Sequence, residues 1–203
     1  MLIDTIKGYV NFVLDYDKEL IDQTGGPFTV LECELPHDRE AMQMGPVKFN
    51  FTYKPDRVDR LANGTVRIVD YKTSDVRTAF SSMDDLFDPT KSKRGTGILQ
   101  LFLYCYAYLQ EKQDLTSVTP VIYKIASMQD SGVKFKPPGR GTTQRQVVFS
   151  MEDGMCQDFV NRMAMTIQDI SQKDFVQCDE RVKSCNYCRF IDFCRRAVKS
   201  NDY

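Results

Sequence analysis

The chain has 203 residues, which is enough for one domain with a hydrophobic core. Hydrophobic residues make up 42% and charged residues 27%, as in an ordinary globular protein. The 27 Lys and Arg residues balance 28 Asp and Glu residues, so any attraction for nucleic acid must come from local clusters. No stretch approaches the roughly 18 apolar residues of a membrane helix, and the charged N-terminus is unlike a signal peptide. We therefore expect a cytoplasmic protein.

Two common enzyme classes are excluded by missing motifs. The single histidine, His37, excludes HExxH zinc proteases, two-His zinc fingers and metal cages built from several histidines. No GxxxxGK[ST] motif occurs, which excludes a P-loop nucleotide hydrolase.

Hydrophobic periodicity predicts the elements of the first half. A helix is predicted at 2–21, followed by strands at 28–35 and 47–53, and the second strand continues towards Asp59. The pair Asn63-Gly64 then separates RVDRLA from TVRIVDYKT, which is a strong hairpin signal.

The second half is predicted to alternate helices with short strands. The expected elements are a loop at 74–96, a buried helix at 98–110, a strand at 118–126, a loop at 134–145, a strand at 146–149 and a helix from Ser150 to about Gln172. With no repeat and no linker, we expect one domain over 1–203, with a core at about 28–172 and a cysteine-rich tail at 173–203.

The hairpin predicts where charged side chains meet. If Asn63-Gly64 is a two-residue turn, Asp59 opposes Ile68 and shares a face with Asp70 and Lys72. The two acids would then be diagonal neighbours, with Cα atoms about 7–8 Å apart. A four-residue turn would also place Asp59 and Asp70 on one face, whereas a three-residue turn would place them on opposite faces.

Asp70 lies between apolar neighbours, so a buried carboxylate that needs a partner or a metal is favoured over a surface ion-pair ladder. Oxygen ligands without a histidine suit Mg²⁺ or Mn²⁺ better than zinc. In the predicted helix, Gln100 and Tyr104 are four residues apart and share a face, inside an otherwise apolar segment. A glutamine there must find hydrogen-bond partners, either in the core or in a site.

Cysteines are concentrated near the C-terminus. Cys178, Cys185, Cys188 and Cys194 lie within seventeen residues, and the last three follow a C-x2-C-x5-C pattern. An odd cysteine count without a secretion signal argues against a disulfide framework. This spacing favours ligation of a metal or an iron–sulfur cluster.

Taken in order, the motifs KPDRVDRLANGTVRIVDYKTSD, GILQLFLYCYAY and CNYCRFIDFC resemble the PD-(D/E)XK nuclease superfamily, and specifically the RecB/AddB-type exonuclease domain. The resemblance runs from about residue 28 to residue 196. It implies an α/β restriction-endonuclease-like fold, in which a central mixed β-sheet is flanked by helices and a cysteine-bound tail follows. It also implies hydrolysis of DNA phosphodiesters that depends on Mg²⁺ or Mn²⁺.

The resemblance assigns roles to individual residues. Asp59 and Asp70 would be metal ligands, and Lys72 would position the attacking water or stabilise the charge on the phosphate. The upstream acid of the family falls on Glu34, with Glu32 as the alternate. Gln100 and Tyr104 match the Q-x3-Y motif that supports the active site. The terminal cysteines would hold a 4Fe–4S cluster, with Cys178 as the nearer candidate for the fourth ligand and Cys33 as the other, and zinc is the structural alternative.

One departure from the family concerns a histidine on a helix before the first strand. Residues 1–27 contain none, and His37 lies after the strand. We therefore expect that the chain is a fragment or a natural truncation with altered metal affinity. DNA contacts are expected from local charge, at Lys91, Lys93 and Arg94 above all.

Three functions follow from these observations. The first is a DNA exonuclease in repair or recombination, working beside a helicase subunit or domain. The second is a truncated or inactive nuclease-fold module that binds DNA or acts as a scaffold. The third is a CRISPR-associated exonuclease.

Overall fold

The computed structural model describes residues 2–88, 95–125, 132–138, 143–174, 185 and 188–195. Its elements in chain order are α1 (Leu2–Thr24), β1 (Thr29–Cys33), β2 (His37–Met44), β3 (Val47–Tyr53), β4 (Arg57–Arg60), β5 (Val66–Lys72), β6 (Ala79–Phe80), α2 (Asp84–Phe87), α3 (Thr96–Glu111), β7 (Ser117–Lys124), β8 (Lys134–Phe135), β9 (Arg145–Gln146), β10 (Phe149–Ser150) and α4 (Gly154–Gln172).

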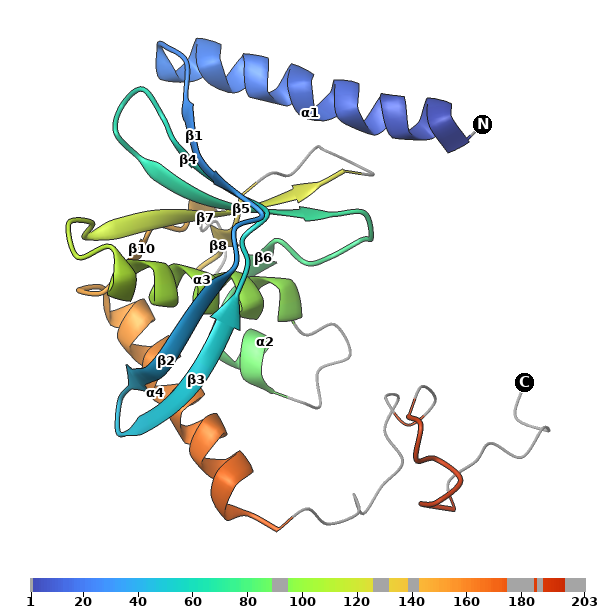
Figure 1. The fold of residues 1–203 in the computed structure, drawn as a ribbon, viewed down its shortest axis with the longest axis vertical. Coiled ribbons are helices and arrows are strands. Elements are labelled where there is room, and N and C mark those ends of the chain that lie inside the picture. The colour runs from blue at the N-terminus through green and yellow to red at the C-terminus, as the bar shows by residue number, and fades with distance from the viewer. Residues whose placement is uncertain are drawn as a thin grey trace. The chain divides into compact units, whose positions relative to one another are not determined.

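A five-stranded mixed sheet forms the centre of the fold, in the order β1-β4-β5-β7-β10. β5 and β7 are parallel, and the other neighbours in this sheet are antiparallel. The chain passes from β5 to β7 through α3, the crossover helix that a parallel pair requires. The predicted fold class, a central mixed sheet flanked by helices, is confirmed (Figure 1).

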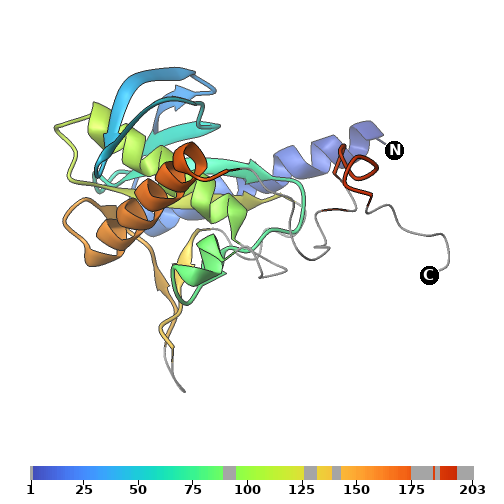
Figure 2. The same cartoon turned by 90° about the horizontal axis from the view of Figure 1, so that it is seen from below.

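Helices α1 and α3 lie on opposite faces of this sheet (Figures 1 and 2). On one face, Val13 and Tyr16 of α1 pack against Val69 and Tyr123. On the other face, α3 packs closely against β7. A Cβ added at Gly97 of α3 would lie 3.7 Å from the Ile122 side chain of β7. Successive residues of β5 and β7 therefore point alternately towards α1 and towards α3.

An aromatic core fixes α3 to its neighbours. The ring of Phe102 lies 5.7 Å from Phe80 of β6, 5.2 Å from Phe149 of β10 and 5.5 Å from Phe159 of α4, measured between centroids. All four side chains are fully or almost fully buried. These edge-to-face contacts hold the crossover helix in place beneath the parallel strands.

Four elements were missed by the sequence analysis: β2, α2, and the two-residue strands β6 and β8, which lie inside the loops predicted at 74–96 and 134–145. Strand β2 has a polar sequence, HDREAMQM, and a bulge between Arg39 and Met42, where Ala41 has a φ of +50°. The bulge breaks the alternation that marks a strand in sequence. The short helix α2 lies inside the predicted loop at 74–96 and is held by one buried side chain, Leu86.

The chain divides into two compact units, Met1–Met165 and Thr166–Tyr203, and the site described below lies in the first. The predicted boundaries of the core and tail stay a prediction. Among the described helices, none has the length and apolar character needed to cross a membrane.

Candidate active site

The β4–β5 hairpin closes through three residues, 62–64, and not through two. The Leu61 amide donates to the Thr65 carbonyl at 2.9 Å, and Gly64 adopts a φ of +88°. Asp59 consequently pairs with Arg67, and Val58 pairs with Ile68. The predicted two-residue turn was wrong, and the shift by one residue moves Asp59 to the opposite face of the sheet from Asp70.

Asp59 belongs to a buried ion-pair network beneath α1. Both of its carboxylate oxygens accept hydrogen bonds from Arg67 at 2.7 Å, and its side chain is fully buried. Arg57 lies 3.0 Å from the same carboxylate and forms a second two-point ion pair with Asp17 of α1, at 2.7 and 3.0 Å. The Tyr123 hydroxyl joins both arginines to Asp17.

This network satisfies Asp59 with two guanidinium groups. Burial by itself lowers the pKa of Arg67, but the hydrogen bonds to Asp59 and the contact with Tyr123 raise it above its ordinary value. The structure therefore does not bring Asp59 together with Asp70, and its predicted pairing with Asp70 around one cation is corrected.

Asp56, which the sequence analysis overlooked, takes the place opposite Asp70. The register pairs Arg57 with Val69, so the next pair outward is Asp56 with Asp70. Asp56 Oδ2 accepts a hydrogen bond of 2.7 Å from the Tyr71 amide, which fixes its carboxylate beside Asp70. The signal was present in the sequence: the two acids of DRVDR are three residues apart, so they point to opposite faces of a strand and only one can face Asp70.

Lys72 connects Asp70 to α3. Its Nζ donates to Asp70 Oδ1 at 3.0 Å and to Gln100 Oε1 at 3.3 Å. Because lysine only donates, the amide of Gln100 is oriented with Nε2 towards the Tyr104 hydroxyl, to which it donates at 2.7 Å. The structure thus joins four of the predicted site residues, Asp70, Lys72, Gln100 and Tyr104, in one chain of hydrogen bonds.

The negative charge of Asp70 is unfavourable in the folded protein. Burial raises its pKa, the Lys72 ammonium lowers it, and the Asp56 carboxylate raises it again, with a net shift upwards. Its Oδ2 is buried and lies 2.8 Å from Lys72 Nζ, yet accepts no hydrogen bond of regular geometry from the described residues. A negative charge held in this way is stabilised by an added cation.

Glu34 lies at the margin of this group. Its side chain is exposed and pairs with Lys54 at 2.8 Å, and the hydrogen bond from Lys54 lowers the pKa of Glu34. Its backbone amide donates to the Asp56 carbonyl at 3.1 Å, so it borders the site. Lys54 is a second neighbour that the sequence analysis overlooked, since both Asp56 and Tyr104 contribute to the raised pKa of Lys54.

The alternate acid, Glu32, belongs to a different cluster. Its carboxylate lies 2.8 Å from His37 Nε2 and accepts from the Tyr108 hydroxyl at 3.3 Å. The other ring nitrogen of His37 lies 3.1 Å from Glu111. The single histidine and Glu32 therefore satisfy each other.

The carboxylate pair fits a hard divalent cation. Among the described residues, no group of three or more His, Cys, Asp and Glu side chains forms a metal site. Mg²⁺, however, keeps several waters and is commonly held by one or two carboxylates together with phosphate oxygens of the substrate. Asp56 and Asp70 supply such a pair, and the buried, unsatisfied oxygen of Asp70 is where a cation lowers the energy most.

The cysteine tail does not fit a cluster in the part of the chain that is described. Cys185, Cys188 and Cys194 form no disulfide and do not gather as a metal site among the described residues. The fourth predicted ligand, Cys178, lies outside the described residues, as do the predicted DNA contacts Lys91, Lys93 and Arg94. A 4Fe–4S cluster and zinc are therefore not supported.

A family model covers most of this chain. The family model of the PD-(D/E)XK nuclease superfamily matches residues 4–195. A search of curated proteins gives no match. Among solved structures, the crystal structure of SSO0001 is 16% identical and aligns with a TM-score of 0.37, over 97% of this chain and 72% of that one.

The buried network predicts a stability defect that a second substitution repairs. Asp59→Leu leaves Arg67 buried without its counter-ion, and we expect the free energy of unfolding to fall by about 3–5 kcal/mol. Asp59→Leu combined with Arg67→Met removes both charges, and most of that loss should be recovered in urea denaturation. A double variant as unstable as the single one would contradict this assignment.

Asp70→Asn should stabilise the metal-free protein. The pKa of Asp70 is raised in the folded state, so folding favours the neutral form, and the wild type loses stability as the pH rises through that window. We expect the variant to melt at a higher temperature than the wild type in EDTA at pH 8, with a smaller difference at pH 4. Added Mg²⁺ should raise the melting temperature of the wild type more than that of the variant. A lower melting temperature for the variant at pH 8 would contradict the assigned cost.

Proposed function

Because the chain belongs to the PD-(D/E)XK nuclease superfamily, we propose that it is a Mg²⁺- or Mn²⁺-dependent deoxyribonuclease that removes nucleotides from DNA ends. The observation that carries the proposal is the convergence of Asp56, Asp70 and Lys72 on the α3 face of the hairpin. Two carboxylates beside one ammonium group are the residue types that metal-assisted hydrolysis of a phosphodiester requires.

Asp56 and Asp70 are the residues that would hold the cation. When bound, the cation would neutralise charge on a phosphoryl oxygen and lower the pKa of a bound water. The ammonium group of Lys72 is positioned to donate to an attacking water or to a phosphate oxygen on the same face.

Gln100 and Tyr104 orient this lysine. The Gln100 amide accepts from Lys72 with its oxygen and donates to Tyr104 with its nitrogen, so the lysine has a second hydrogen-bond partner besides Asp70. The Tyr104 hydroxyl acts as acceptor in that hydrogen bond, which leaves its own proton available for a phosphate of the substrate. Glu34 and Lys54 lie at the edge of the candidate active site and are not assigned a role in hydrolysis.

An inactive scaffold is less well supported by these contacts. A protein that no longer needed catalysis would gain stability by replacing Asp70 with a neutral residue, because its buried carboxylate bears a net cost. The retention of Asp56, Asp70 and Lys72 with matched geometry favours a working site.

The proposal also covers the subtype of nuclease, its pathway, its partner and its location in the cell. Similarity of the motif order supports a RecB/AddB-like exonuclease that works in DNA repair or recombination with a helicase subunit or domain, in the cytoplasm. A CRISPR-associated exonuclease is the alternative, since it shares the cysteine pattern.

We predict that the wild type digests linear DNA in Mg²⁺ or Mn²⁺, and that EDTA stops the reaction. Asp56→Asn, Asp70→Asn and Lys72→Met should each lower the rate by about 100-fold or more, as expected for groups that act in the transition state. The measurement is release of label from end-labelled linear DNA, with a covalently closed circle of the same sequence to separate exonuclease from endonuclease activity.

The matched control for these variants is Asp59→Leu/Arg67→Met, which changes charged residues of the same hairpin on its other face. We expect its rate to stay within about threefold of the wild type. Equal digestion by the wild type and by the three site variants would remove the proposed function.

A further inference from the structure

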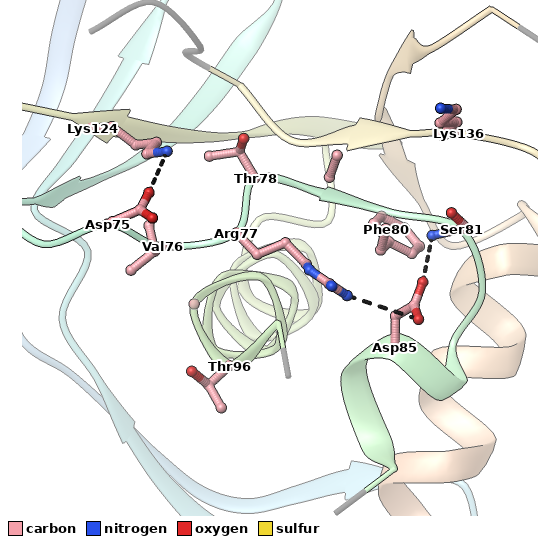
Figure 3. Close-up of a pocket in the computed structure, with 12 residues that line it drawn as sticks. Asp75, Val76, Arg77, Thr78, Phe80, Ser81, Asp85, Thr96, Lys124 and Lys136 are labelled. Atoms are coloured by element: carbon pink, nitrogen blue, oxygen red, sulfur yellow. Dashed lines mark hydrogen bonds and ion pairs between the residues drawn. The ribbon is translucent and has the colours of Figure 1, made fainter. Parts of the chain in front are cut away.

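A cavity of about 750 Å³ opens beside the candidate active site, at the C-terminal ends of β5 and β7 (Figure 3). Its charged and polar lining comes from the β5–β6 connection, α2, α3, β7 and the segment after β8, and includes Asp75, Arg77, Thr78, Asp85, Lys124 and Lys136. Its size is that of a site for a small ligand or for one unit of a polymer.

The cavity and the candidate active site share a wall. Lys124 is the register partner of Lys72 in the neighbouring parallel strand, so the two side chains leave the sheet on the same face. Gly97 lines the cavity, and a Cβ added there would lie 3.8 Å from Lys72 Cε. The cavity therefore lies directly beside Lys72.

The two acids in the lining differ in how firmly they are held. Asp85 Oδ2 accepts from the amides of Ser81 and Ser82 at 2.7 and 3.3 Å, and Arg77 lies 3.8 Å from its other oxygen (Figure 3). Only 15% of its side chain is exposed, so Asp85 is a fixed part of the wall.

Asp75 is held differently, since 84% of its side chain is exposed while it pairs with Lys124 at 2.8 Å. Lys124 itself is only 18% exposed. The Asp75 carboxylate is already largely solvated and an exposed ion pair is weak, whereas the mostly buried side chain of Lys124 lines the cavity. A second anion can therefore take the place of Asp75 on Lys124.

We propose that this cavity binds a phosphodiester of the substrate strand next to the one cleaved, and that Lys124 is the residue that binds it. Asp75 occupies Lys124 in the free protein and yields it to the phosphate. This inference rests on the proposed function, because it assigns the neighbouring subsite of the same polynucleotide substrate. It predicts that recognition extends beyond the cleaved bond along the strand.

Binding can be measured separately from hydrolysis, because EDTA removes the divalent cation that hydrolysis would need. The probe is a fluorescein-labelled oligothymidylate of twelve nucleotides, and the protein is the full chain. Lys124→Gln should weaken binding by about tenfold, the worth of one charge-assisted contact. It should also reduce the slope of log affinity against log salt by about 0.7, the value for one phosphate of a single strand. Lys124→Arg should keep most of the affinity, and Asp75→Asn should increase it.

The matched control is Lys112→Gln, which removes a lysine that also pairs with carboxylates but lies in the His37 cluster. Its affinity should stay within about twofold of the wild type. If Lys124→Gln binds as tightly as Lys112→Gln does, the subsite is overturned. Melting curves of each variant show whether it is folded. If Lys124→Gln is not folded, Asp75→Asn provides the test, and an affinity no higher than that of the wild type would then overturn the subsite.

Kinetics then separate binding from catalysis. In Mg²⁺, Lys124→Gln should raise KM for the oligonucleotide by a similar factor, and a loss confined to kcat would overturn the assignment. If the wild type hydrolyses no DNA but the differences in binding hold, the proposed nuclease activity fails and the subsite stands. If the wild type hydrolyses DNA and the binding differences are missing, only the subsite fails.

Discussion

The three-residue turn between β4 and β5 determines which charged groups meet. With Arg60 paired to Val66, every second residue of the hairpin faces α1 and the others face α3. Asp59 and Arg67 thereby join the buried network under α1, while Asp56 and Asp70 face the crossover helix. One residue more or less in the turn would exchange these faces, so the turn controls both the stability of the hairpin and the position of the candidate site.

The charged groups are fully paired on one face of the hairpin and incompletely paired on the other. On the α1 face, Asp59 and Arg67 satisfy each other with two short hydrogen bonds, so the network fixes the helix without leaving charge available for chemistry. On the α3 face, Asp70 is opposed by another carboxylate and only partly compensated by Lys72. Such incomplete compensation disfavours the charged form of Asp70 in the free protein, and perturbed carboxylates of this kind are common at functional sites.

The hydrophobic periodicity of the sequence was sufficient to predict several of the helices and strands that form the site. The helix at Leu2–Thr24, the buried helix around Gln100 and the strand that ends in Lys72 follow from periodicity, and so does the contact of Lys72 with its own face. The partner of Asp70 could not be derived with certainty from the residue pattern, because Asn63-Gly64 fits turns of two, three and four residues and these differ in parity. The acid pair in DRVDR showed that one member must face Asp70, but only the register identified Asp56.

The parallel pairing of β5 and β7 explains why a cavity lies next to the candidate site. Parallel neighbours bring their C-terminal ends to one edge of the sheet, and the crossover helix must begin at that same edge. Lys124 and the first turn of α3 consequently line one cavity, and Lys72 lies beside Gly97 of that turn, although these residues are far apart in the sequence. Antiparallel pairing would have sent Lys124 to the opposite edge. The topology itself therefore places a second ammonium group one strand away from the first, on the same face of the sheet.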